Sequence, residues 1–392
     1  MHGIENNFQE RRDRSGRLPV PTLPTLIERG DGHPQQRSAL RRRCHVELLA
    51  RPEQAATIGA NAVEAFQRLE HDFARWNWLD PSGMVACASG TAAVHLALEA
   101  LQLPRGAEVV CSDFNMIAVP RAIALAGLSP VFVDCGDDLL MDIGLLSGHL
   151  SECSEKDASP AAVVAVHIYG RVCDVDQITN AASWERFRVI EDLAEAHGVR
   201  PHLQTDAACW SFFRNKVIAG QEGGAVYFRD PARAAIARQL RCLGFTDKHD
   251  FLHVPRGHNY RLSNIHAELI LDSLANVDAN VARRREVERW YDELCPTDWR
   301  MPARISPWVY DLRIPGLTQE RQDHAVRLLI EHGIQARHAF RPMSWQEEFA
   351  NCRLVRGAEH VAARLGVEVL YLPLAGVTQE DAKLAFEILR GL

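Results

Sequence analysis

The sequence predicts an α/β protein with a mostly parallel sheet flanked by helices, followed by a smaller α+β domain. From about residue 84, short apolar segments alternate with stretches of helical periodicity, and this alternation requires the crossover connections of a parallel sheet. The chain has 392 residues, which is more than one hydrophobic core usually serves, so two packed domains are expected. We place the large domain at residues 61–275 and the small domain at 276–392, after an irregular arm at 1–60.

Two kinds of segment alternate in the large domain. The strand segments are short and apolar, and the segments between them carry apolar residues at helical spacing. Ligands bind at the carboxyl ends of the strands in sheets of this kind, so functional residues are expected at that edge. The predicted strands span 84–88, 108–111, 130–134, 162–168, 188–191 and 225–228, and the predicted helices span 91–102 and 115–126.

The small domain begins and ends with a helix. Thr378 and Asp381 have a spacing that resembles a capping box, which predicts that the last helix starts at Thr378. Gly333 ends an earlier helical pattern. The predicted elements are a helix at 280–294, a strand at 307–314, a helix at 318–331, a strand at 367–372 and the closing helix.

The charge and hydropathy patterns exclude several classes of partner. The 44 basic and 51 acidic residues give a net charge of -7, so neither nucleic acid nor an anionic membrane is expected to bind. The three arginines at 41–43 are interpreted as a solvated face or partner contact rather than a phosphate site. No apolar run approaches the roughly 18 residues that cross a bilayer, and the N-terminus lacks a signal-peptide core, so a cytoplasmic protein is expected.

The cysteines and histidines do not predict a metal site. The 10 cysteines and 17 histidines contain no C-x-x-C pair and no H-E-x-x-H motif. We interpret the cysteines mostly as small, buried apolar side chains.

The segment ASGTAA at 88–93 follows a predicted strand and opens a predicted helix. Small residues there expose free backbone N–H groups, and the helix dipole adds positive potential, so a phosphate fits. An ordinary turn with Thr91 as the helix cap explains this segment equally well when it is taken alone.

The segment VIEDLAEAHG at 189–198 places acidic residues where an apolar strand ends. A buried carboxylate such as Asp192 needs a cationic partner, because an unpaired buried charge is costly or shifts its pKa until it is neutral. A protonated pyridine nitrogen is one such partner. The alternatives are that Asp192 caps the next helix or pairs with an arginine.

The segment CWSFFRNKVIAGQEGG at 209–224 sets one lysine between an aromatic strand and a glycine-rich turn. Burial lowers the pKa of an amine by up to about 3–5 units, which prepares Lys216 for Schiff-base chemistry. A lysine that extends its ammonium into water is the alternative.

Taken together, these segments have the order found in fold-type I enzymes that use pyridoxal phosphate (PLP). From about residue 60 to the C-terminus the chain resembles the DegT/StrS family of sugar aminotransferases. The motifs that carry the resemblance are SGTAA, VHIYG, IEDxAEAHG, SFFxNK, EGGAV, HNYRLSNIHA at 258–267 and GIQARHAFRPM at 333–343.

The resemblance implies a role for each matching residue. Lys216 would carry PLP as a Schiff base and later move a proton, and Asp192 would hold the pyridine nitrogen protonated. Glu195 would face the ring hydroxyl, at a position where many relatives have glutamine. The phosphate would lie among Ser211 and the backbone of Gly90, Thr91 and Ala92. Asn259 or Arg261 would reach the phosphate of a neighbouring subunit, which requires a homodimer.

Two further assignments are implied by the resemblance. The family usually covers the cofactor with an aromatic ring where this chain has Met116, so either Met116 or Phe114 covers the ring here, and we prefer Met116. Arg337 and Arg341 are candidates for binding a donor carboxylate or a substrate phosphate, with ordinary surface arginines as the alternative.

The predicted function is transfer of an amino group from glutamate or glutamine to a keto sugar, with a nucleotide-linked sugar as the preferred acceptor. A keto-cyclitol or aminoshikimate-type acceptor is a second possibility on the same scaffold. A regulator that binds PLP without turning over substrate is a third.

Overall fold

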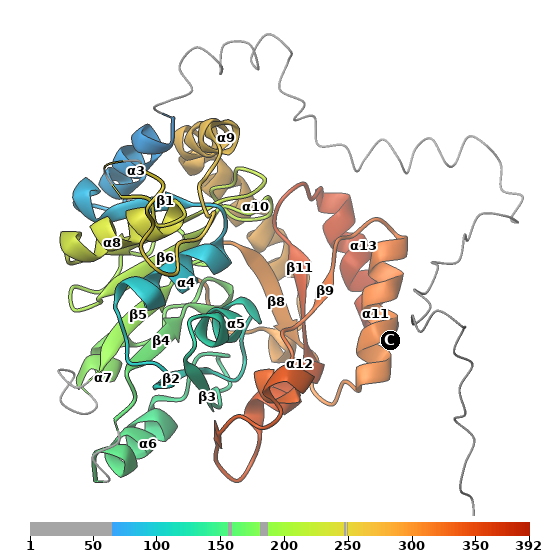
Figure 1. Ribbon diagram of the computed structural model, residues 1–392. Coiled ribbons are helices and arrows are strands. Elements are labelled where there is room, and N and C mark those ends of the chain that lie inside the picture. The colour runs from blue at the N-terminus through green and yellow to red at the C-terminus, as the bar shows by residue number, and fades with distance from the viewer. Residues whose placement is uncertain (1–64, 156–158, 181–186, 247, 249) are drawn as a thin grey trace, which may run out of the picture. The chain divides into compact units, whose positions relative to one another are not determined.

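The computed structural model describes residues 65–155, 159–180, 187–246, 248 and 250–392 (Figure 1). The predicted arm at 1–60, including the arginines at 41–43, lies outside these residues. The described residues form one sheet of eight strands and one of three.

The eight-stranded sheet is mostly parallel, as predicted. Its order is β1-β7-β6-β5-β4-β2-β3-β10, and only the two pairs that contain β7 are antiparallel. Every residue of β1, β4 and β6 is buried, which is typical of strands with both faces covered. The predicted fold class is therefore confirmed. The strands are β1 (Met84–Cys87), β2 (Glu108–Ser112), β3 (Ser129–Val133), β4 (Ala162–Val166), β5 (Arg188–Asp192), β6 (Ala207–Ser211), β7 (Gly224–Phe228) and β10 (Leu354–Val355).

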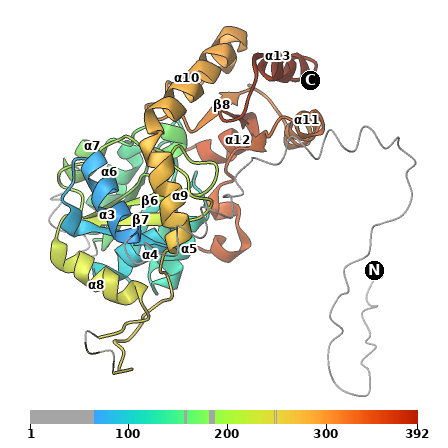
Figure 2. The ribbon, with the colours of Figure 1, turned by 90° about the horizontal axis from the view of Figure 1, so that it is seen from above.

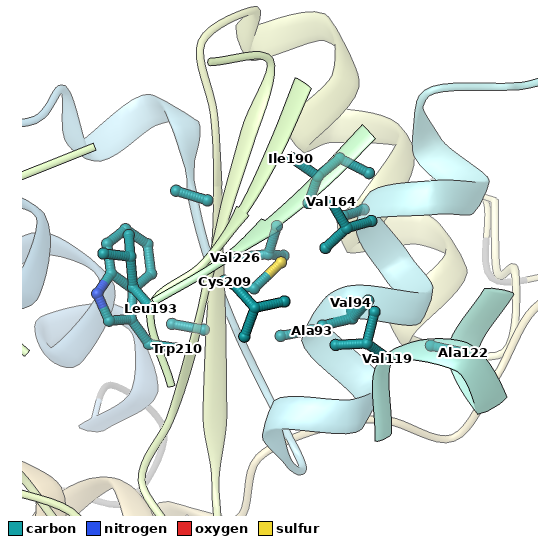
Figure 3. Close-up of a cluster of buried hydrophobic side chains, with 14 of the residues drawn as sticks. Ala93, Val94, Val119, Ala122, Val164, Ile190, Leu193, Cys209, Trp210 and Val226 are labelled. Carbon is teal, nitrogen blue, oxygen red and sulfur yellow. The ribbon is translucent and has the colours of Figure 1, made fainter. Parts of the chain in front are cut away.

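Helices cover both faces of this sheet (Figure 2). On one face, Val94 and Val119 of α4 and α5 point toward Val164, whereas Trp210 lies on the other side of the strands (Figure 3). There the ring of Phe73, from α3, packs edge-on against Trp210 with a centroid distance of 5.3 Å. The helices are α3 (Ala65–Trp76), α4 (Gly90–Ala100), α5 (Ala118–Leu125), α6 (Ile143–Glu155), α7 (Val175–Asn180) and α8 (Pro231–Arg241).

The C-terminal residues build a second apolar core around the three-stranded antiparallel sheet, whose order is β8-β11-β9. The last helix has the predicted capping box between Thr378 and Asp381. The elements are α9 (Asn264–Ala275), α10 (Val277–Leu294), β8 (Val309–Arg313), α11 (Gln319–Glu331), β9 (Arg337–His338), α12 (Val361–Glu368), β11 (Val369–Pro373) and α13 (Gln379–Arg390). Short 3-10 helices lie at η1 (Pro81–Gly83), η2 (Ile168–Gly170), η4 (Thr297–Trp299), η5 (Met343–Trp345) and η6 (Glu347–Phe349).

The C-terminal residues also complete the large sheet. β10 pairs in parallel with β3 at its edge, and Asp134 accepts hydrogen bonds from the backbone N–H groups of Val361 and Ala362 at the start of α12, at 2.8 Å each. Two-residue strands such as β9 and β10 are too short to show a periodicity, so the sequence did not predict them. The domain boundary at 275 stays a prediction.

The helix predicted at 115–126 begins later, at Ala118. The residues before it form a turn that brings Asp113 against Ser344 and His360, with contacts of 2.7–3.0 Å. This tertiary contact outweighs the local helical pattern. Among the residues that the structure describes, no helix has the length and hydropathy needed to span a bilayer.

Candidate active site

Lys216 lies in the turn between β6 and β7, with its amine buried at the carboxyl edge of the sheet. Its Nζ is 3.8 Å from Glu195 Oε1 and 3.6 Å from the centroid of the Trp308 ring. Burial lowers the pKa of the amine, while Glu195 and Asp192 oppose this shift. A fraction of the amine is thus kept neutral, the form in which it is a nucleophile and a base.

Asp192 is the last residue of β5, the strand next to β6. Its Oδ1 accepts a hydrogen bond from Ala194 N at 2.9 Å, and it makes no other side-chain hydrogen bond among the described residues. Burial raises the pKa of this carboxyl, and the hydrogen bond from Ala194 and the charges of Lys216 and His167 pull it back. The buried carboxyl still lacks a direct cationic partner, so a protonated ring nitrogen placed beside it would meet an electrostatic need.

Glu195 faces Lys216 from the segment after β5. Its Oε2 accepts a hydrogen bond from Tyr169 N at 2.8 Å, and Tyr169 holds a left-handed backbone conformation with φ 52°. Burial raises the pKa of the Glu195 carboxyl to about 7, against the opposing charge of Lys216. Near neutral pH this side chain can therefore both donate and accept a hydrogen bond.

The raised pKa of Glu195 predicts how stability depends on pH in the protein without cofactor. The folded state binds a proton here that the unfolded state, with its ordinary carboxyl pKa of 4.5, has released. The stabilisation from this group is thus complete below about pH 4.5 and is lost as the pH rises through about 7. We expect the unfolding free energy of wild type, measured by urea titration, to fall over that range relative to that of Glu195→Gln, whose side chain does not titrate. A wild-type value that stays constant or rises relative to that of the variant would contradict this.

The N-terminus of α4 approaches the end of β6 closely. A Cβ placed on Gly90 would lie 2.7 Å from Ser211 Cβ, so only glycine permits this approach. Ser89, not Thr91, caps α4, because its Oγ accepts from Ala92 N at 3.1 Å. The interpretation of Thr91 as the cap is therefore wrong. Free N–H groups and the Ser211 hydroxyl meet here, as a phosphate site requires.

Two buried side chains, those of His197 and Arg284, hold the Lys216 turn in place. His197 Nδ1 accepts from Ile218 N at 3.0 Å and its Nε2 lies 3.0 Å from Ser211 O. Burial lowers the pKa of His197 to about 3, so the neutral ring donates through Nε2. Arg284 of α10 donates to Lys216 O at 3.0 Å and to Trp308 O at 2.9 Å. Sequence reasoning did not assign these residues; His197 stood within a quoted motif, whereas Arg284 gave no signal.

Aromatic side chains form one wall beside the amine. Tyr169 lies 5.9 Å from Trp308, 5.4 Å from Tyr371 and 5.0 Å from Phe340, measured between ring centroids. The Tyr169 hydroxyl also accepts a hydrogen bond from Phe340 N at 3.1 Å. These residues come from distant parts of the sequence, and no local pattern distinguishes them from core residues.

Phe114 and Met116 differ in how they are held. Phe114 is fully buried against Tyr169 and Phe340, with centroid distances of 6.0 and 5.9 Å. Met116 is 48% exposed, and its sulfur accepts from Ala118 N at 3.1 Å. Because the Phe114 side chain is packed in the core, Met116 is the better candidate to cover a bound ring.

The two arginines of the small domain have different surroundings. Arg341 donates to Gly366 O and, at 2.8 Å, to Gln322 Oε1, so its guanidinium already holds α12 against α11. Arg337 is exposed on β9, opposite Tyr371 of β11. Since Tyr371 belongs to the aromatic wall, Arg337 remains the better candidate for binding a substrate anion.

Asn259 and Arg261 lie apart from the other predicted cofactor residues. Both are exposed and line a cavity of about 520 Å³ together with Phe66 and Cys242. None of the other predicted cofactor residues lines this cavity. Their position is compatible with a role in the site of a second subunit.

The comparisons with known proteins agree with this geometry. Residues 53–390 match the DegT/DnrJ/EryC1/StrS aminotransferase family. A GDP-perosamine synthase from Caulobacter vibrioides is 31% identical over 315 residues, which cover 76% of this chain and 82% of that protein. A dTDP-3-amino-3,4,6-trideoxy-alpha-D-glucose transaminase from Micromonospora megalomicea is 30% identical and covers 79% and 84%.

The fold is also that of a solved structure. A DegT DnrJ EryC1 StrS aminotransferase from Brucella abortus superposes with a TM-score of 0.77 at 23% identity, covering 91% of this chain and 97% of that one. The match to the family extends over almost all of the described residues. The chain therefore belongs to the DegT/DnrJ/EryC1/StrS aminotransferase family and is a PLP-dependent aminotransferase.

Proposed function

We propose that this enzyme transfers an amino group from glutamate or glutamine to the keto group of a nucleotide-linked sugar. The observation that carries the proposal is the buried group of Lys216, Asp192 and Glu195 at the carboxyl edge of the sheet. The two relatives described above, a GDP-perosamine synthase and a dTDP-amino-sugar transaminase, carry nucleotide-linked sugars in their names.

The residues present fit PLP. Asp192 would supply a buried carboxylate for the ring nitrogen, and Glu195 would face the ring hydroxyl. Ser211 and the backbone N–H groups of Gly90 and Thr91 would provide the anion site, whereas Ala92 N already donates to Ser89 Oγ, and Met116 would cover the ring. When bound, PLP supplies a conjugated ring that withdraws electrons from the carbon bearing the transferred nitrogen.

Lys216 performs the proton transfers. As the residue that would carry the cofactor, it would have its amine beside the substrate carbon once the donor is bound. Burial favours the neutral amine, which accepts a proton from that carbon and returns it at the neighbouring position. The neutral His197 would hold the turn at Ile218 and Ser211, the Arg284 guanidinium would hold the Lys216 carbonyl, and Arg337 would bind the carboxylate of the donor.

The active sites are proposed to be shared between two subunits of a homodimer, with Asn259 or Arg261 reaching the phosphate in the partner. Large apolar side chains are exposed on the segment between α8 and α9, at Phe251 (79%) and Leu252 (67%), and on α9, at Ile265 (57%). Figure 2 shows this segment extending past α8. Exposed large apolar side chains are often part of a protein interface. Light scattering of the purified protein should give the mass of a dimer.

Gly90 allows a test of the anion site. Replacing Gly90 by alanine puts a Cβ against Ser211, so α4 or β6 must shift and the anion site opens. We expect the affinity for PLP to fall by about tenfold or more. Titration of cofactor-free protein with PLP, followed by absorbance, measures this. Gly148→Ala is the matched control, because its Cβ would meet nothing within 4 Å; an equal loss in both variants would rule out the assignment.

Two other functions remain to be separated from this one. A keto-cyclitol or aminoshikimate-type acceptor fits the same chemistry, and a PLP-binding regulator would keep the pocket without turnover. Holoenzyme should be titrated with glutamate and with glutamine while the cofactor absorbance is followed, and then given nucleotide-linked keto sugars or keto-cyclitols. Spectral change with a donor and amination of the nucleotide-linked sugar support the proposal. Preference for the cyclitol or no change with either donor would overturn it.

A further inference from the structure

Three side chains that can bind a metal meet outside the active site. His95 and Glu99 lie one turn apart on α4 and therefore on the same face of the helix. His258 reaches them from the segment between α8 and α9. One ligand atom from each of the three lies within 4.8 Å of the other two.

His95 is the member of this cluster that the fold alone does not explain. The residue is 2% exposed, and its Nε2 has no hydrogen-bond partner among the described residues. Its Nδ1 lies 3.1 Å from the Tyr260 hydroxyl, and donation from Nδ1 would leave a lone pair on Nε2. That lone pair lies toward Glu99, whose Oε1 is 3.9 Å away. A buried nitrogen without a partner is unusual and costly.

Glu99 and His258 complete the arrangement. His258 Nε2 is 2.6 Å from Glu99 Oε2, and the His258 ring stacks on Tyr260 at 4.8 Å with an angle of 16°. The side chain of His258 is 23% exposed, whereas those of His95 and Glu99 are 3% and 6% exposed. The cluster is thus closed on one side and open to solvent at His258. A hydrogen bond accounts for the pair of Glu99 and His258 but leaves His95 Nε2 unused.

We propose that His95, Glu99 and His258 bind a divalent transition-metal ion of the zinc type, with water in the open position. Two imidazoles and one carboxylate suit zinc, whereas calcium and magnesium prefer oxygen ligands. Ligand atoms about 2.0–2.2 Å from a tetrahedral ion lie about 3.3–3.6 Å apart. In the structure, His258 Nε2 lies 2.6 Å from Glu99 Oε2 and His95 Nε2 lies 3.9 Å from Glu99 Oε1, so the side chains are close to these spacings and would rotate to admit the ion.

An ion at this place would join two parts of the fold. It would fix α4, which begins at Gly90, to the segment that carries His258 and the neighbouring Asn259. The Tyr260 hydroxyl would hold the orientation of His95, as a hydrogen-bond partner of a metal-bound histidine commonly does. The metal would therefore stiffen the segment rather than take part in amino transfer.

Titration of tag-free, full-length holoenzyme with Zn²⁺ after treatment with a chelator tests the proposal. Calorimetry should give one site per chain in the wild type, and Co²⁺ in its place should show the absorption of a tetrahedral ion. Glu99→Gln and His258→Gln should each weaken this binding by at least about tenfold. His253→Gln is the matched control, because His253 lies exposed on the same segment and outside the cluster.

The comparison among these variants decides the outcome. Other residues can also bind Zn²⁺, among them the histidines at 2, 33 and 45 and the cysteine at 44, which lie outside the described residues. The test is therefore the difference in binding between the variants, not the total metal bound. Melting curves without metal verify that each variant is folded. Equal binding by the wild type and all three variants would overturn the proposal, as would the absence of binding to the wild type at micromolar Zn²⁺. Neither result would bear on aminotransferase activity. Loss in Glu99→Gln and His258→Gln alone supports it.

Discussion

Replacing Lys216 by alanine is expected to remove aminotransferase activity by a factor of roughly 10³ or more. The substitution deletes both the attachment point of the cofactor and the only amine placed beside Glu195 and Trp308 in the described part of the chain. General acid–base catalysis alone contributes about 10²–10⁴-fold, and the loss of covalent attachment adds to this. Initial rates with donor and acceptor, measured at saturating PLP, give the factor directly.

Chemical labelling provides a second measurement for Lys216. Borohydride treatment of the holoenzyme should attach the cofactor permanently to one peptide, the one that contains Lys216, and mass spectrometry identifies it. Lys383→Ala is the matched control, because Lys383 is exposed on α13 and should leave both activity and labelling unchanged. Label on another lysine, or near-normal turnover by Lys216→Ala, would remove the basis of the mechanism.

Lys216→Arg tests whether the reaction needs the positive charge at this position or the neutral amine. A guanidinium keeps a positive charge near Glu195, so the electrostatic balance of the pocket is partly retained, but it cannot lose a proton at these pH values. We expect it to be as inactive as the alanine variant. Activity in Lys216→Arg would mean that the charge, and not the neutral amine, is what the reaction requires.

Sequence reasoning succeeded where a short segment carries both structure and chemistry. Asp192 ends β5 and Lys216 lies in the turn after β6, so the rule that ligands bind at the carboxyl ends of parallel strands predicts both at one edge. The structure brings both of them near Glu195, and it sets Gly90 against Ser211. In such segments, neighbours in sequence decide the geometry.

Residues that act from a distance could not be found in this way. Arg284 reaches the Lys216 carbonyl across 68 positions of sequence, and Trp308 lies under the amine from the start of β8. In the sequence, Arg284 is an ordinary member of an amphipathic helix and Trp308 an ordinary core residue. Likewise, nothing local distinguishes Arg341, which stabilises α12, from Arg337, which remains exposed. Only the packing of distant segments makes these distinctions.

Asp192→Asn is expected to lower activity by about 10²–10³-fold while leaving the fold intact. Asparagine has the same shape and can still accept the hydrogen bond from Ala194 N. It lacks the negative charge that would keep the ring nitrogen protonated, so the ring becomes a weaker electron sink. The slowed step is proton removal from the donor, which stopped-flow absorbance of the half-reaction measures; the absorbance maximum of the bound cofactor should shift as well.

Stability distinguishes this catalytic explanation from damage to the fold. Burial raises the pKa of Asp192, which means that the ionised carboxylate destabilises the folded protein when no cofactor is bound. A neutral side chain of the same size should therefore unfold at the same or a higher urea concentration than wild type. Slow chemistry in a protein of undiminished stability would show that the carboxylate serves the cofactor rather than the fold. Conversely, an Asp192→Asn variant that unfolds more readily yet transfers nitrogen at the normal rate would assign Asp192 to the fold alone.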